Sequence, residues 1–377
     1  MVFEASGGLA PAVLFLVGVV IVVVSVETFI EAVAEAALAL GASGFFLTVV
    51  LAGTDLENVV LGLTAAVREL PGLALGTVFG EALFVLAAAV GLAGVVVPFE
   101  TNVPRSYLGL MILSPLLFLA LALDGTLSRL DGAILTAIFL PYLAVVYALE
   151  RRTETQYLSA EEIALQEDET GTEVDDRRGA EADDGRGTEA DNGTGTRGSD
   201  REEDGGWSNL DIDLDLDIDD LVAERVPERY RGVAYLAVAV VAAIGMTVGS
   251  ELAVSGAGDL LELLGVTGLT FGATVLSFVA SLEELFLTVE PVRRGRPHIG
   301  VGNVVGSVLF FVSANAGLIA MVRPLDTTGT VLTVHWPFFL LTLSIVAVAF
   351  LRGRVDRPTG VLLLGVYLAY WLANYAV

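Results

Sequence analysis

The chain is 377 residues long, 54% of them hydrophobic, and carries a formal net charge of −26. It has no cysteine, which excludes disulfides and thiolate metal sites, and its acidity offers no basic surface to a nucleic acid. All of its basic residues are arginine, and this acidic, lysine-free composition is typical of a halophilic source, where salt screens the repulsion.

Apolar runs of about 20 residues recur along the sequence, each long enough to cross a hydrocarbon core of ~30 Å. The mean hydropathy of +0.72 agrees with a chain that lies largely in a lipid bilayer. We therefore predict an all-α polytopic membrane protein with about ten transmembrane helices. The runs cover residues 8–28, 45–67, 72–97, 107–123, 132–149, 231–250, 266–289, 299–322, 330–351 and 359–376.

The second apolar run carries Asp55, Glu57 and Asn58 at its centre, in the stretch AGTDLENVVLGL. A carboxylate at bilayer depth costs about 2.5–3.5 kcal/mol on insertion scales. Carboxylates that persist there indicate a shared interior in which cations or protons neutralise them. The third run adds a further acid, Glu81.

Residues 151–228 separate two membrane halves, a first half over 1–150 and a second over 229–377. This stretch holds 26 acidic residues and 8 arginines, and its Gly-, Thr- and Asp-rich composition predicts a disordered linker. Its alternating end, LDIDLDLDIDD at 210–220, is interpreted as a solvated acidic tether, with a weak cation-binding segment as the alternative.

The second half repeats the first. Thr48–Phe84 aligns without a gap on Thr274–Phe310, with twelve identities in 37 positions, and Glu57 corresponds to Glu283. Five crossings in each half would place the two halves in opposite orientations. An inverted repeat with polar groups at matching depths is the sequence signature of a secondary transporter, whose site lies between the repeats.

The arginines predict the orientation. With the acidic linker in the cytoplasm and both termini outside, twelve arginines near helix ends lie inside and only Arg68, Arg129 and Arg323 lie outside. This arrangement follows the positive-inside rule for a cell-membrane protein.

Small polar residues precede the paired glutamates, Thr54 and Asp55 in the first half and Ser281 in the second. Such residues tolerate local unwinding of a helix, which frees carbonyl oxygens as ligands. Ligands that are all oxygen suit Ca²⁺ or Na⁺ rather than Zn²⁺ or Cu²⁺. Asn315, farther along the second half, could line the same cavity or bond to a helix backbone.

Two pairs of motifs resemble the sodium/calcium exchanger (cation/calcium antiporter) superfamily, whose two repeats carry GTSLPEL followed by GNxxGSN. The pairs here are GTDLENV at 53–59 with GTVFGE at 76–81, and VASLEEL at 279–285 with GNVVGS at 302–307. The resemblance covers the chain outside the linker. It implies exchange of Ca²⁺ against Na⁺ or H⁺, with no enzymatic activity and no cofactor.

The motifs depart from the family pattern at the ligands. The ion-binding glutamate of the family corresponds to Glu284 in the second repeat but to Asn58 in the first, and Glu283 and Glu57 replace the proline that precedes it. The charge of the site is thus kept while its ligands are rearranged.

The helices that follow also differ from the family. Ser307 keeps the serine of the family, Glu81 replaces it in the first repeat, and Val85 and Phe311 stand one turn on, where the family has Asn or Asp. We predict one divalent cation near the midplane. Its predicted ligands are Thr54, Asp55, Glu57, Asn58, Glu81, Ser281, Glu283, Glu284 and Ser307.

Two other functions stay open. Asn58, Val85 and Phe311 favour a non-transporting membrane protein that retains the exchanger fold as a cation sensor or scaffold. A channel is less favoured because nothing resembles a selectivity filter.

Overall fold

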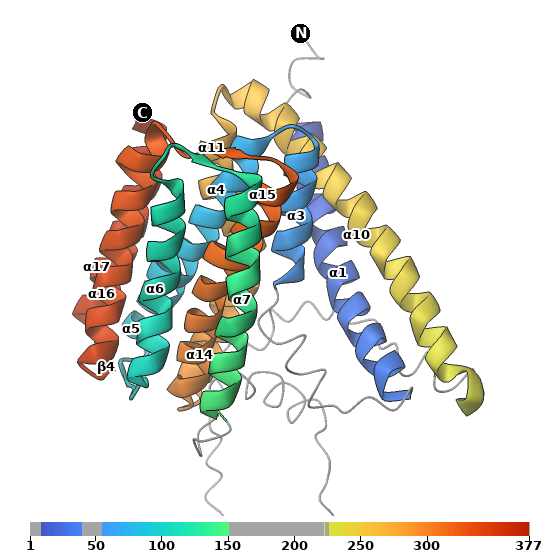
Figure 1. Ribbon diagram of the computed structural model, residues 1–377, viewed down its shortest axis with the longest axis horizontal. Coiled ribbons are helices and arrows are strands. Elements are labelled where there is room, and N and C mark those ends of the chain that lie inside the picture. Colours follow the sequence, from blue (N-terminus) through green and yellow to red (C-terminus); the bar gives the residue numbers. More distant parts are fainter. Residues whose placement is uncertain (1–8, 40–54, 151–221, 223–225, 377) are drawn as a thin grey trace, which may run out of the picture.

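The computed structural model describes residues 9–39, 55–150, 222 and 226–376 (Figure 1). The first half contains the helices α1 (Leu9–Ala39), α3 (Leu56–Val67), α4 (Pro71–Leu83), α5 (Val90–Val96), α6 (Arg105–Ala122) and α7 (Arg129–Glu150), and the π-helical segment η1 (Phe84–Ala89). The predicted linker over 151–228, with its acidic tether, lies almost entirely outside the described residues.

The second half follows a similar order, but it also contains helical segments that have no described counterpart in the first half. Its α-helices are α10 (Glu228–Leu264), α11 (Gly268–Phe271), α12 (Ser277–Ala280), α13 (Leu282–Arg293), α14 (Pro297–Leu309), α15 (Ala316–Val322), α16 (Trp336–Leu351) and α17 (Arg357–Ala376). Its π-helical segments are η2 (Gly272–Leu276), η3 (Phe310–Asn315) and η4 (Val331–His335). Four two-residue strands, two in each half, are β1 (Phe99–Glu100), β2 (Thr126–Leu127), β3 (Leu325–Asp326) and β4 (Arg354–Val355).

The helical membrane class is confirmed. Within the described residues, seven helical stretches are long and apolar enough to cross a membrane, and an eighth is formed if the bent pair Gly268–Ala280 and Leu282–Arg293 is one span. α3 is too short to count by itself, because the part of its apolar run before Asp55 lies outside the described residues. The prediction of ten spans is therefore supported in part.

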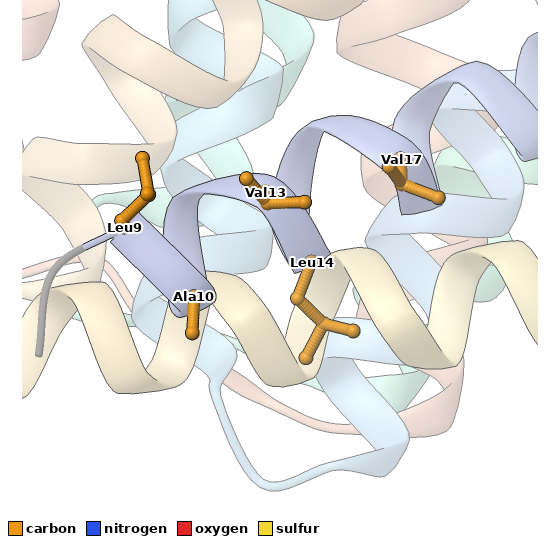
Figure 2. A pocket seen from close by; sticks show the side chains of 5 residues that line it. All are labelled: Leu9, Ala10, Val13, Leu14 and Val17. Carbon is orange, nitrogen blue, oxygen red and sulfur yellow. The ribbon is translucent and has the colours of Figure 1, made fainter. Parts of the chain in front are cut away.

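The outer helices expose apolar side chains. On α1, Leu9, Val13 and Val17 are exposed and border a small hollow that is lined by apolar side chains alone (Figure 2). Valines and leucines are exposed in the same way on α10 and α17. An apolar outer surface of this kind is suited to lipid.

The centre of the bundle is formed by two equivalent helical stretches, Pro71–Val96 and Pro297–Val322, each 89% buried in its most apolar part. Each consists of an α-helix, a π-helical segment and a second α-helix, and every boundary in one recurs 226 residues later in the other. α3 and α13 are separated by the same 226 residues. The repeat seen in the sequence therefore extends to the local structure.

Contacts between the halves follow the same correspondence. β1 pairs with β4 and β2 pairs with β3, so each two-stranded sheet takes one strand from each half. The backbones of Gly91 and Gly360 approach closely, and so do those of the corresponding residues Gly317 and Gly132. Exchanging the two halves maps each contact onto the other, which is the relation expected of a pseudo-twofold axis.

The Gly360 contact leads to a stability prediction. A Cβ added at Gly360 would lie 2.6 Å from the Gly91 carbonyl oxygen, whereas one added at Gly365 of the same helix would meet nothing within 4 Å. We expect Gly360→Ala to lower the unfolding midpoint, at a cost of about 1–3 kcal/mol for overpacking. Gly365→Ala should leave the midpoint unchanged or raise it slightly. Thermal unfolding of both purified variants checks this, and equal midpoints would contradict the close helix contact.

Candidate cation-binding site

The polar residues of the two repeat motifs meet in the centre of the bundle, where α3 and α13 begin. Asp55 is the N-cap of α3, and its carboxylate accepts hydrogen bonds from the backbone and side-chain amides of Asn58. In the second half, Ser281 separates α12 from α13 and the helical stretch bends by 50°. The predicted local unwinding ahead of the glutamates is therefore present at Ser281.

Glu284 is the centre of a buried hydrogen-bond cluster. Asn303 Nδ2 donates to its Oε2 at 2.7 Å, and the Ser307 hydroxyl lies 3.0 Å from both carboxylate oxygens. Asn303 Nδ2 also lies 3.2 Å from the Thr288 hydroxyl, one helical turn after Glu284. We call these four residues, Glu284, Thr288, Asn303 and Ser307, the Glu284 cluster.

The first half places its acid on the other helix. Asn58 stands where Glu284 stands in the second half, and Glu81 stands where Ser307 stands. Glu81 is fully buried and accepts a hydrogen bond of 3.3 Å from Asn315 Nδ2, which comes from η3 in the second half. At these two pairs of corresponding positions, each half therefore has one buried acid, Glu81 on α4 in the first half and Glu284 on α13 in the second.

Glu57 and Glu283 approach each other between the halves. The charges of Asp55, Glu283 and Glu284 all act on the Glu57 carboxylate. Glu57 is 6% exposed, whereas Glu283 is exposed. Adjacent residues on a helix point about 100° apart, which explains why Glu284 faces the core while Glu283 does not.

Several buried oxygens at this site have no hydrogen-bond partner among the described residues. They are Oδ1 of Asn58, Oε1 of Glu81, Oγ of Ser281 and Oδ1 of Asn315. A buried polar atom without a partner costs roughly 1–3 kcal/mol. A bound cation would satisfy such oxygens, since each has lone pairs to offer.

The arrangement of the acids limits what a cation would contact. In the part of the chain that the structure describes, no group of three or more acidic or histidine side chains is arranged to hold a metal ion. A cation in this centre would therefore need amide and hydroxyl oxygens as well as carboxylates. Such mixed oxygen sets are usual for Ca²⁺ and for other hard cations.

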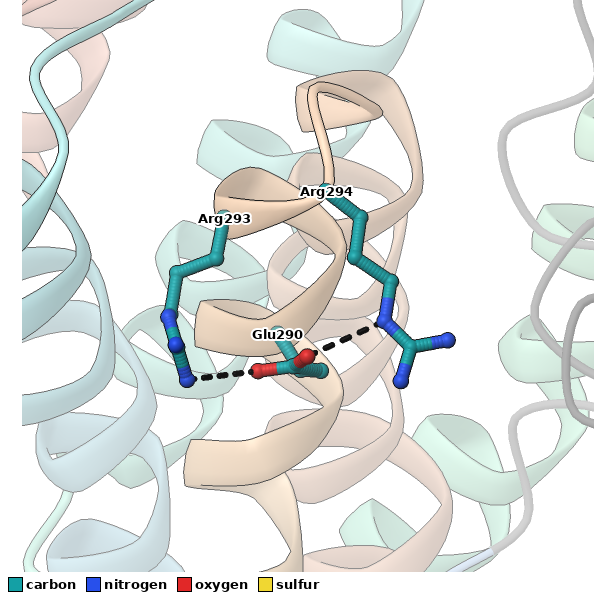
Figure 3. A network of polar contacts seen from close by, with 3 residues as sticks. All are labelled: Glu290, Arg293 and Arg294. Atoms are coloured by element: carbon teal, nitrogen blue, oxygen red, sulfur yellow. Dashed lines mark hydrogen bonds and ion pairs between the residues drawn. The ribbon is translucent and has the colours of Figure 1, made fainter. Parts of the chain in front are cut away.

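The arginines near the ends of α3 and α13 form ion pairs with glutamates other than the buried acids of the centre. Glu290, near the end of α13, binds Arg293 at 3.1 Å and Arg294 at 3.0 Å (Figure 3). At the end of α3, Arg68 contacts Glu251 of α10 at 3.5 Å. These ion pairs are partly exposed, in contrast to the buried acids of the centre.

The structure describes eight of the nine predicted ligands, and the ninth, Thr54, lies outside the described residues. Six of the eight are buried, Asp55 is half-buried and Glu283 is exposed. Val85 and Phe311 are fully buried and apolar. The prediction did not include Thr288 and Asn303 among the ligands, although Asn303 belongs to the GNVVGS motif that was recognised. Asn315 lines the site, because its side chain binds Glu81.

Comparison with known proteins points to the same family as the two repeat motifs. A family model described as sodium/calcium exchanger protein matches residues 10–148 and 234–376. The inner membrane protein YrbG of Escherichia coli is 29% identical over 97% of this chain and 98% of its own length. The sodium/calcium exchanger MaX1 of Methanosarcina acetivorans is 29% identical over 31% of this chain and 33% of its own.

Among solved structures, the sodium-calcium exchanger NCX_Mj soaked with Na⁺ and no Ca²⁺ covers 96% of this chain and 97% of its own, at 18% identity and a TM-score of 0.49. The family model spans both membrane halves, which together are most of the sequence. The chain therefore belongs to the sodium/calcium exchanger protein family.

Proposed function

We propose that the protein is a secondary-active antiporter that exchanges Ca²⁺ against Na⁺ or H⁺ through the carboxylate site at the centre of the bundle. As a member of an exchanger family it is a multi-pass membrane transporter and not an enzyme. The observation that carries the proposal is the set of buried, unpartnered oxygens beside Glu57, Glu81 and Glu284. They need a ligand that accepts lone pairs.

The chemistry of the centre supports a hard cation as the transported substrate. Asp55, Glu57, Glu81, Glu283 and Glu284 repel one another electrostatically. A divalent ion that entered among them would relieve this repulsion, and two or more monovalent ions would do so equally. An exchanger requires a site whose negative charge can be balanced either by one divalent ion or by two or more monovalent ions.

The repeat supports alternating access. We propose ten spans in two inverted five-helix halves, so that the same helices approach the site from opposite faces of the membrane. The constant spacing of 226 residues and the exchanged contacts of the strands and glycines support this arrangement. Rocking of one set of helices against the other would open the site to one face at a time.

The proposed topology places both termini outside and the linker at 151–228 in the cytoplasm. It can be tested directly, because the natural sequence contains no cysteine. We expect a single cysteine introduced near residue 190 to resist an impermeant thiol reagent in intact cells and to react after the membrane is opened. A cysteine at the exposed Leu123, which should lie outside, is the matched control. Labelling of residue 190 from outside would reject the topology.

Transport itself is tested in proteoliposomes that contain the purified protein. We expect Ca²⁺ uptake when an outward Na⁺ gradient or an outward H⁺ gradient is imposed, and the effective gradient identifies the coupling ion. If protons couple, uptake should vary steeply with pH, and Glu57→Gln should flatten that dependence. No uptake under either gradient would instead favour the sensor or scaffold, in agreement with the apolar Val85 and Phe311.

A further inference from the structure

His335 is a buried polar side chain that the cation site itself does not include. It is the last residue of η4 and is fully buried. Its Nδ1 lies 2.7 Å from the hydroxyl of Tyr370 on α17, which is fully buried as well. A polar ring in an apolar interior is costly unless it is hydrogen-bonded, so this bond fixes the orientation of the His335 ring.

The His335 ring packs against Phe79 of α4, with the two ring centroids 5.3 Å apart. Phe118 of α6 and Trp336 of α16 contact the same phenyl ring, at centroid distances of 5.7 and 5.2 Å. All four rings are buried. We call Phe118, His335 and Trp336 the aromatic wall, because together they cover the Phe79 side of α4.

A second constraint on α4 comes from Gly80, the residue that follows Phe79. A Cβ added at Gly80 would lie 2.7 Å from the Ala273 carbonyl oxygen, so the backbone of α4 lies directly against η2 on this side. Phe79 and Glu81 flank Gly80 and point about 200° apart, so Glu81 faces away from the aromatic wall. The wall and the glycine contact together determine where α4 holds Glu81.

Glu81 depends on its helix for its position more than Glu284 does. The Glu284 carboxylate accepts hydrogen bonds from two side chains of α14, whereas Glu81 receives, among the described residues, a single bond of 3.3 Å from Asn315. In the second half, Val305 stands where Phe79 stands in the first and offers no ring. The aromatic contact therefore occurs on the site helix whose acid has the fewer hydrogen bonds.

We propose that His335 is a positioning residue for cation binding. Held by Tyr370, it fixes Phe79 and with it the backbone of α4, and so sets how far the Glu81 carboxylate reaches into the site. His335 acts through Phe79 and does not itself contact the cation. The inference rests on the proposed function in taking Glu81 as a cation ligand.

The first test measures the Ca²⁺ concentration that half-saturates uptake into proteoliposomes. His335→Ala should raise this concentration at least about 10-fold, as is usual when a residue that orients a metal ligand is lost, and should change the maximal rate less. Tyr370→Phe removes only the hydroxyl that holds His335, so it should raise the concentration by a smaller factor. If His335→Ala cannot be purified, Tyr370→Phe carries the test.

A double-mutant cycle with Glu81 separates positioning from a general loss of stability. If His335 acts through Glu81, His335→Ala should cause no further rise in a Glu81→Gln protein. If Glu81→Gln shows no uptake, Glu81→Asp, whose carboxylate is already displaced, replaces it in the cycle. The matched control is Phe350→Leu, which alters a buried ring near the other end of α16 and should keep the half-saturating concentration of the wild type.

A second measurement needs neither transport nor a bound cation. Amide hydrogen exchange of the purified protein is compared between α4 and its counterpart α14. His335→Ala should speed exchange in α4 and leave exchange in α14 as in the wild type, because local opening follows the loss of local packing.

Three results of the uptake measurements would overturn the inference. They are a wild-type half-saturating concentration in His335→Ala and Tyr370→Phe, an equal rise in Phe350→Leu, and an undiminished effect of His335→Ala in the Glu81 variant. Absence of Ca²⁺ uptake by the wild type would instead reject the proposed function. Exchange in α4 would then decide the inference alone, and unchanged exchange would overturn it.

Discussion

Replacing Glu284 by glutamine is expected to slow cation exchange strongly. Glu284 is buried and receives hydrogen bonds from Asn303 and Ser307, so its charge is held in place at the centre of the bundle. Glutamine keeps the shape of the side chain but removes the charge and offers a single acceptor oxygen. Hydrogen bonds to charged groups contribute about 1.5–3 kcal/mol, so we expect Ca²⁺ uptake to fall by roughly 10- to 100-fold.

The matched control for this variant lies on the same helix. Glu290→Gln removes a glutamate that is partly exposed and paired with Arg293 and Arg294 near the end of α13 (Figure 3). Exposed ion pairs of this kind contribute about 0–1 kcal/mol, so exchange should remain close to wild type. Equal uptake by Glu284→Gln and wild-type vesicles would show that Glu284 is not part of the cation path.

Glu57→Ala and Glu283→Ala should each abolish exchange. These glutamates approach each other between the halves, on the proposed cation path. Alanine removes one of the two charges that would attract the cation. We expect no uptake above that of empty vesicles in either variant, measured under the gradient that drives the wild type.

Asp55→Asn provides the comparison for these two variants and should weaken exchange less. The Asp55 carboxylate caps α3 and binds the amides of Asn58, and asparagine is an equally good N-cap residue. The helix start would therefore be preserved while one negative charge is lost. Unchanged uptake in both alanine variants would move the cation path away from Glu57 and Glu283.

The sequence predicted the parts of the fold that depend on local pattern. Apolar runs indicated the helices, and the ungapped alignment of the two repeats anticipated the constant spacing between α3–α4 and α13–α14. The small polar residue Ser281 indicated the bend before α13. Two-residue strands such as β1 and β4 carry no alternation that a sequence could show, and they could not be foreseen.

The site was predicted less completely, for a physical reason. Glu284 and Ser307 were found because they keep the residues of the family at its motif positions, although Asn58 and Glu81 stand at those positions in the first half. Asn315 has no polar counterpart in the first half, and its partner Glu81 lies 234 residues away in the chain. Only the packing of η3 against α4 brings these two side chains together, and no spacing within either half encodes that contact.

As an antiporter, the protein should move Ca²⁺ only in exchange for another cation. Vesicles that contain the wild-type protein are loaded with radioactive Ca²⁺ and diluted into medium containing Na⁺, protons at low pH, or only N-methylglucamine. We predict rapid release of Ca²⁺ with an exchangeable cation outside and retention with N-methylglucamine alone. Release into all three media, or into none of them, would contradict antiport.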